Sequence, residues 1–125
     1  MRRAWLVLRA LYELARYDAI VRLRGSGAVL GQLRRQSVAE GGDSGWEQAV
    51  SDATQLATCF YWKPVLCLQR AVVTARLLRQ HGVAGRVAIG YRPAPFFSHA
   101  WVEVDGRVVY GSPAYQTRLR LLHVV

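Results

Sequence analysis

One stretch of the sequence, from Pro64 to Gly106, constrains the fold more than any other. It begins with a helical pattern, in which apolar residues recur every three or four positions until Gly82. Two short strand-like segments follow, and Asp105-Gly106 is a strong signal for a hairpin turn. A helix that leads into antiparallel strands predicts an α+β fold, with the helix packed on a small antiparallel sheet.

The same periodicities assign elements to most of the chain. We expect Gly25-Ser26-Gly27 to end the first helix, Gly82 to end the last one, and Pro64 to end or redirect the chain. Ser44 and Glu47 form a capping-box pattern at the start of the third helix. The expected helices are 3–23, 29–35, 46–60 and 65–81, and the expected strands are 86–90, 99–104 and 107–110.

The first helix is apolar over an unusually broad arc. We expect its core-facing side to be the series with three- and four-residue spacing. Such a helix needs cover from the rest of the domain or from a partner protein. The series consists of Trp5, Leu8, Tyr12, Ala15, Ala19 and Leu23.

Length and composition indicate a single domain over residues 1–125. The chain is 52% hydrophobic, which is enough to form one core. Within it we separate a helical N-terminal region, 1–45, from the region 46–113 that holds the candidate site. The two cysteines and three histidines show no metal-ligand spacing, so we expect no metal and no other cofactor. Two cysteines are also few for a secreted domain, which favours the cytoplasm.

The charge is strongly basic, at +9 with an isoelectric point near 10.6. A nucleic-acid-binding module is one interpretation. The arginines are spread over several elements and accompany no recognition motif, so we favour solvated faces and acidic partners. Arg9, Glu13 and Arg16 interrupt the apolar N-terminus, so we expect neither a signal peptide nor an integral membrane segment.

The chemistry is concentrated in Cys67 and His99. Cys67 stands at the expected start of a helix, and His99 lies about thirty residues later on a strand. A helix N-terminus and a neighbouring imidazole both favour the reactive thiolate form of a cysteine. In this interpretation His99 accepts the thiol proton, and the backbone amide of Cys67 stabilises the oxyanion.

The other candidates are less defined. The second oxyanion donor stays open among Gln55, Tyr61 and Trp62. We interpret Cys59 as a core residue and His81 as a residue favoured by the helix C-terminus. His123 has no evident partner.

Four segments together resemble one known family. They are Cys67-Leu68-Gln69-Arg70-Ala71, the run from Leu77 to Val83, Val87 to Tyr91, and His99-Ala100-Trp101-Val102-Glu103. This combination resembles the leader peptidase of lasso-peptide biosynthesis, the B protein, in the transglutaminase-like cysteine protease superfamily. The resemblance is tight over residues 55–113 and loose over the N-terminal helices.

The resemblance implies a function and a set of partners. Such proteins cut a ribosomally made precursor peptide between its leader and its core. An asparagine-synthetase-like, ATP-dependent cyclase then joins the new amine to an acidic side chain. From its length the chain resembles the stand-alone protease form, which implies a separate leader-recognition protein as a further partner.

One position departs from the family pattern. The family's third catalytic residue is an aspartate on the return strand, and here that position is Gly111. Three explanations stay open: a Cys67–His99 dyad that works alone, a substitute orienting residue, or a weakened or inactive scaffold that binds precursor or cyclase. The candidate substitutes are Ser112, Asp105 and Glu103.

Hairpin geometry favours Ser112 among these substitutes. A two-residue turn at Asp105-Gly106 pairs Val104 with Arg107, and an uninterrupted register then places His99 opposite Ser112. Substrate contacts are assigned to Trp101, Trp62 and Tyr91. Trp101 is open to two interpretations, as a packing residue or as a wall of a peptide groove.

Overall fold

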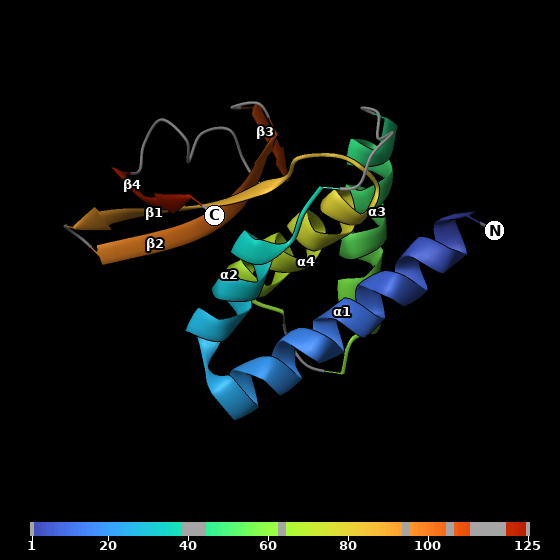
Figure 1. Cartoon of the computed structure of the whole chain (residues 1–125), viewed down its shortest axis with the longest axis horizontal. Coiled ribbons are helices and arrows are strands. Elements are labelled where there is room, and N and C mark those ends of the chain that lie inside the picture. The colour runs from blue at the N-terminus through green and yellow to red at the C-terminus, as the bar shows by residue number, and fades with distance from the viewer. Residues whose placement is uncertain are drawn as a thin grey trace.

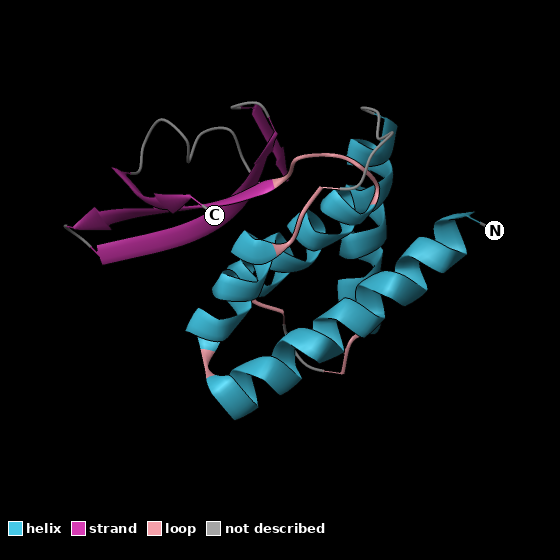
Figure 2. Ribbon diagram, viewed as in Figure 1, coloured by secondary structure: helices cyan, strands magenta, loops and turns pink. Residues whose placement is uncertain are grey.

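The computed structural model describes residues 2–38, 45–62, 65–93, 96–104, 107–110 and 120–124. Four helices form one side of the molecule, and an antiparallel sheet forms the other (Figure 1, Figure 2). This arrangement confirms the predicted α+β class. The elements are α1 (Arg2–Arg24), α2 (Ser26–Arg35), α3 (Gly45–Phe60), α4 (Cys67–Gln80), β1 (Arg86–Pro93), β2 (Phe96–Val104), β3 (Arg107–Tyr110) and β4 (Arg120–Val124).

The sheet has the strand order β3-β2-β1-β4, and every neighbouring pair is antiparallel. β1 and β2 pair without interruption, from Arg86 opposite Glu103 to Pro93 opposite Phe96. Both strands are longer than the sequence pattern predicts. Residues 120–124, where the sequence shows no clear pattern, form β4 against the free side of β1.

The β2–β3 pairing corrects one expectation. Val104 lies opposite Arg107, as the hairpin signal predicts, but a bulge between Val102 and Glu103 shifts the register by one residue. Val102 therefore lies opposite Tyr110, whereas an uninterrupted register would place it opposite Val109. The predicted pairing of His99 with Ser112 depended on that uninterrupted register, and residues 105, 106 and 111–119 lie outside the described residues.

The core surrounds α4. This helix contacts α1, α2 and α3 on one side and β1 and β2 on the other. Most of the length of α4 is therefore buried. Its small and β-branched side chains let the neighbouring helices and strands pack closely against it. The buried apolar residues of α4 are Ala71, Val72, Val73, Ala75, Leu77 and Leu78.

The burial of α1 is opposite to our expectation. The predicted core-facing series is exposed, with 65% of Leu8 and 81% of Leu23 accessible to solvent. Leu6, Ala10 and Leu14 face the core instead. Both series have helical spacing, so periodicity alone could not choose between them. Glu13 lies on the buried side as well, where it is 2% exposed and pairs with Arg76 of α4 at 2.8 Å.

Four local expectations also change or lie outside the described residues. The break after α1 is Gly25 alone, in a left-handed conformation with φ 88°, and Ser26 already begins α2. Cys59, interpreted above as core, is exposed, so that interpretation is wrong. Ser44 of the capping box and Pro64 lie outside the described residues.

Candidate active site

The structure places Cys67 at the first residue of α4. The preceding residue, Leu66, occupies the N-cap position with extended backbone angles (φ −82°, ψ 165°). A leucine has no side-chain oxygen to accept from the first-turn amides, and Leu66 is 74% exposed. Cys67 is half-buried and is a free thiol. The positive end of the helix dipole therefore acts at the sulfur without a capping side chain from Leu66.

Tyr17 of α1 lies near enough to Cys67 for the two groups to interact electrostatically, and Asp18 is its neighbour on α1. The pKa of Tyr17 is raised, first by burial and then by the negative charges of Asp18 and Cys67. Tyr61, from the turn before α4, donates its hydroxyl to the Asp18 carboxylate. Burial and this hydrogen bond raise the pKa of Tyr61 to about 12. Tyr17 and Tyr61 therefore both stay protonated at neutral pH, and Tyr17 is the one that interacts with Cys67.

A second contact fixes the start of α4 against α1. The Gln69 amide donates to the Leu14 carbonyl oxygen at 3.0 Å, and Gln69 is 4% exposed. The Tyr61 hydroxyl lies 3.3 Å from the same carbonyl oxygen. Since α1 supplies this anchor, the position of the first turn of α4 depends on packing between helices that are about fifty residues apart in the sequence.

His99 lies on β2 opposite Gly90 of β1 and is half-buried. Burial lowers the pKa of its imidazole below the usual 6.5. The ring is therefore neutral at pH 7 and is able to accept a proton. That is the state a general base requires before the reaction.

The elements that carry Cys67 and His99 are in contact, because α4 packs on β2 (Figure 1). Ala100, Val102 and Val104 of β2 belong to the core that α4 shares. Strand alternation groups His99 with Trp101 and Glu103 on the other side of the strand. The contact between α4 and β2 therefore does not by itself direct the His99 side chain toward Cys67. A hydrogen bond between the two side chains stays a prediction.

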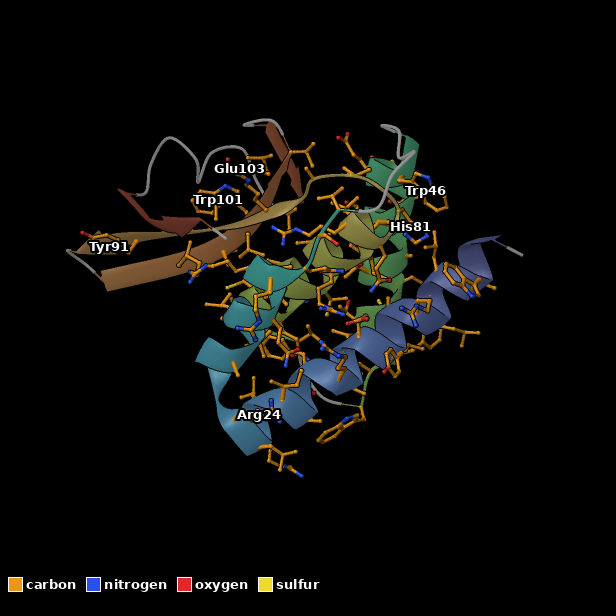
Figure 3. All side chains as sticks on the ribbon, viewed as in Figure 1. Arg24, Trp46, His81, Tyr91, Trp101 and Glu103 are labelled. Atoms are coloured by element: carbon orange, nitrogen blue, oxygen red, sulfur yellow. The ribbon has the colours of Figure 1, made fainter. Side chains whose placement is uncertain are left out.

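Trp101 is a packing residue in this structure. It is 1% exposed, and its indole N–H donates to the Glu103 carboxylate at 2.6 Å. Figure 3 shows the two side chains beside each other on the sheet. Of its two interpretations, burial supports packing over the wall of an open groove. Glu103, a candidate to orient His99, uses a carboxylate oxygen for this indole, while Asp105, Gly111 and Ser112 lie outside the described residues.

The remaining candidates are the substrate-contact residues Tyr91 and Trp62 and the possible oxyanion donor Gln55. Tyr91 is half-buried on β1, toward the end of the sheet far from β3 (Figure 3). Gln55 is exposed on α3. Trp62 is 76% exposed and, with Tyr61, borders a hollow of about 490 Å³ against α1. The assignment of substrate contacts to Trp62 and Tyr91 stays a prediction.

The described residues offer neither a metal site nor a membrane-spanning helix. Among them, no three histidine, cysteine, aspartate or glutamate side chains are grouped closely enough to hold a metal ion. None of the helices within the described ranges is both long enough and apolar enough to cross a bilayer.

Comparison with known proteins identifies the family. The chain matches the family model of the Transglutaminase-like superfamily over residues 4–124, which is nearly its whole length. The protein belongs to this superfamily. It is also similar to the microcin J25-processing protein McjB of Escherichia coli, with 34% identity over 56 residues. The matched segment is 45% of this chain and only 27% of McjB. No solved structure gives a significant match.

Sequence reasoning missed Tyr17 and Asp18. Both lie on the broad apolar helix α1, far from Cys67 in the sequence. Asp18 carries a weak signal, since a carboxylate within a mostly apolar helix needs a partner. Its partner, Tyr61, becomes apparent only when α1 and the turn before α4 are seen in contact.

Proposed function

We propose that this protein is a cysteine peptidase that removes the leader from a lasso-peptide precursor. The observation that carries the proposal is the position of Cys67, at the uncapped start of the central helix of a transglutaminase-like domain. The similarity to a microcin-processing protein supports the substrate class. The matched segment is only 27% of that relative. Membership in the superfamily therefore does not establish the substrate or the partners of this protein, and both are part of the proposal.

The reaction begins with Cys67 as nucleophile. His99 takes the thiol proton, and the thiolate attacks the carbonyl carbon of the last leader residue. The uncapped first-turn amides of α4 supply positive charge for the oxyanion. The C–N bond then breaks as His99 returns the proton to the amine of the core peptide, and water hydrolyses the thioester.

Two partners follow from this role. A separate leader-recognition protein presents the precursor, and an ATP-dependent cyclase uses the amine that cleavage releases. Neither step requires a cofactor on this chain. The peptidase acts upstream of the cyclase in this sequence of reactions.

A second candidate function rests on Gly111, which has no side chain to orient His99. In this alternative the domain is a scaffold that binds the precursor or the cyclase without cleaving. A missing orienting carboxylate costs on the order of 10⁴-fold in turnover in serine triads, while a cysteine nucleophile depends less on its base.

Mass spectrometry of the precursor separates the two functions. The precursor is incubated with its leader-recognition protein and with wild type, Cys67→Ala or Gly111→Asp. Cleavage by wild type that is absent in Cys67→Ala supports the peptidase. Cleavage only by Gly111→Asp means that the missing carboxylate limits the enzyme. If none of the three cleaves while wild type binds the precursor, the scaffold function is correct.

A further inference from the structure

The outer side of α1 carries exposed apolar side chains along its whole length. The large ones are well exposed, from 51% for Trp5 to 81% for Leu23. Monomeric proteins rarely leave such a continuous apolar surface without a binding partner. In Figure 1 this helix runs along the side of the molecule far from the sheet. We call this surface the α1 outer face, and it comprises Trp5, Leu8, Tyr12, Ala15, Ala19 and Leu23.

The shape of the α1 outer face suits inserted side chains. Ala19 borders two hollows, one of about 490 Å³ toward Tyr61 and Trp62 and one of about 310 Å³ toward Gln32 of α2. Because alanine is short, the helix surface is low between these hollows. A partner helix with apolar side chains at helical spacing can lie along α1 and fill them.

The charge around the α1 outer face is positive. Arg9 and Arg16 are partly exposed beside it, and Arg22 and Arg24 are exposed near its end. The acidic residues of α1 offset this charge only in part. The one carboxylate of Glu13 is shared by three arginines, Arg9, Arg16 and Arg76. The Asp18 carboxylate accepts the Tyr61 hydroxyl and keeps its charge. Because α1 carries six arginines and two carboxylates, a positive excess remains. A partner that carries carboxylates beside its apolar side chains therefore complements this surface.

Two other occupants fit less well. A second copy of this chain would bring the arginines of two α1 helices together, on proteins that each carry +9. A lipid surface favours an apolar strip free of charge, with cations at its margins. Here the strip is not free of charge, because the guanidinium of Arg9 beside it lies 6.0 Å from the Trp5 ring centre and 5.4 Å from the Tyr12 ring centre.

We propose that the α1 outer face binds an acidic amphipathic helix of a partner polypeptide. Apolar side chains of that helix fill the two hollows beside Ala19, and its carboxylates pair with the arginines of α1. Arg22 and Arg24, which are exposed near the end of α1, are placed to receive them. This binding does not require thiol chemistry, so it goes beyond the proposed function and does not depend on it.

The test uses the full chain and a labelled synthetic amphipathic helix, with leucine and tryptophan on one face and glutamate on the other. A twin peptide with lysine in place of glutamate and vesicles of phosphatidylglycerol serve as comparison ligands. Binding is measured by fluorescence anisotropy for wild type, Leu8→Glu, Ala19→Trp and Cys67→Ala. Leu56→Glu, at another exposed leucine on α3 (42% accessible), is the matched control.

We expect the acidic peptide to bind and the lysine twin to bind at least about tenfold more weakly. Leu8→Glu and Ala19→Trp should each weaken binding about tenfold, while Leu56→Glu and Cys67→Ala should leave it unchanged. Thermal melts verify that each variant is folded. The proposal is wrong if both peptides bind equally, if neither binds, if Leu56→Glu weakens binding as much as Leu8→Glu, or if only the vesicles bind. If wild type binds the acidic peptide but does not cleave the precursor, the proposed function is wrong and this proposal stands.

Discussion

The two ends of α4 are built in opposite ways. At its C-terminal end, Gly82 adopts φ 84° and the chain folds back, so that the Val83 amide donates to the Leu78 carbonyl oxygen at 2.8 Å. The His81 ring lies against the Trp46 ring at a tilt of 43°, with ring centres 4.0 Å apart (Figure 3). At its N-terminal end, Leu66 contributes no capping oxygen and projects into solvent. One helix therefore has a closed end and an open end.

This difference separates stability from chemistry. The closed end satisfies its own backbone groups and sets the angle at which β1 leaves the helix. The open end keeps its first-turn amides and its dipole for the Cys67 sulfur and for a bound substrate. A capping side chain there would stabilise the helix and compete for the same amides. The following changes at the two ends test this separation.

Removal of the thiol at the open end should have the largest effect. Cys67→Ala deletes the nucleophile, and we expect precursor cleavage to fall by on the order of 10³-fold or more. The melting temperature should change little, because the side chain is only half-buried and loses one atom. Cys59→Ala removes the other, exposed thiol and is the matched control. Equal cleavage by Cys67→Ala and wild type would assign the chemistry to another residue.

A substitution near the closed end should lower the stability of the fold and leave the chemistry of Cys67 unchanged. A Cβ at Gly85 would lie 2.9 Å from Leu78 Cδ1 and 3.4 Å from the Ala75 Cα, and Leu78 is fully buried. We therefore expect Gly85→Ala to lower the free energy of unfolding by about 1–3 kcal/mol. Chemical denaturation monitored by circular dichroism measures this change.

Gly27→Ala is the control for this substitution. Gly27 lies in α2, and a Cβ there meets nothing within 4 Å. The substitution should raise stability by about 0.5–1 kcal/mol, because alanine favours the helix. Equal effects of the two substitutions would mean that the close approach of Gly85 to Leu78 does not limit stability.

The sequence predicted the closed end of α4 better than its open end. Gly82 is a signal that acts over a few residues, and α4 does end before it. The Asp105-Gly106 signal is equally local, and Val104 does lie opposite Arg107. The start of the helix at Cys67 was also expected. The approach of Tyr17 to the thiol was not, because it depends on packing between residues that are fifty positions apart in the sequence.

The same limit explains the reversed burial of α1. Two apolar series on one helix have the same period, so the choice depends on tertiary contacts, which include the pairing of Glu13 with Arg76, 63 residues away. β4 was missed for a similar reason. Its residues form a strand because they pair with the edge of β1 that β2 does not occupy. No local pattern in residues 120–124 predicts that pairing.

A cap placed at the open end tests the trade between stability and chemistry. Leu66→Ser introduces a hydroxyl at a position that already has extended N-cap angles, and the lost leucine is mostly exposed. We expect a gain of about 1 kcal/mol in the free energy of unfolding, with slower alkylation of Cys67 by iodoacetamide. Leu66→Ala is the control, since it removes the leucine without adding an acceptor. A faster reaction in Leu66→Ser would contradict the role of the uncapped amides.

The smallest effect concerns the pH dependence of stability. Burial lowers the pKa of His99 in the folded chain, whereas the unfolded imidazole titrates near its usual value of about 6.5. Below that value the unfolded chain binds more protons, so stability falls as the pH drops and levels off once the folded imidazole is also protonated. His99→Gln removes this contribution, while His81 and His123 stay in both proteins. Melting temperatures at pH 7.5 and pH 5 should therefore differ more for wild type than for His99→Gln, and equal differences would place His99 in a fully solvated setting.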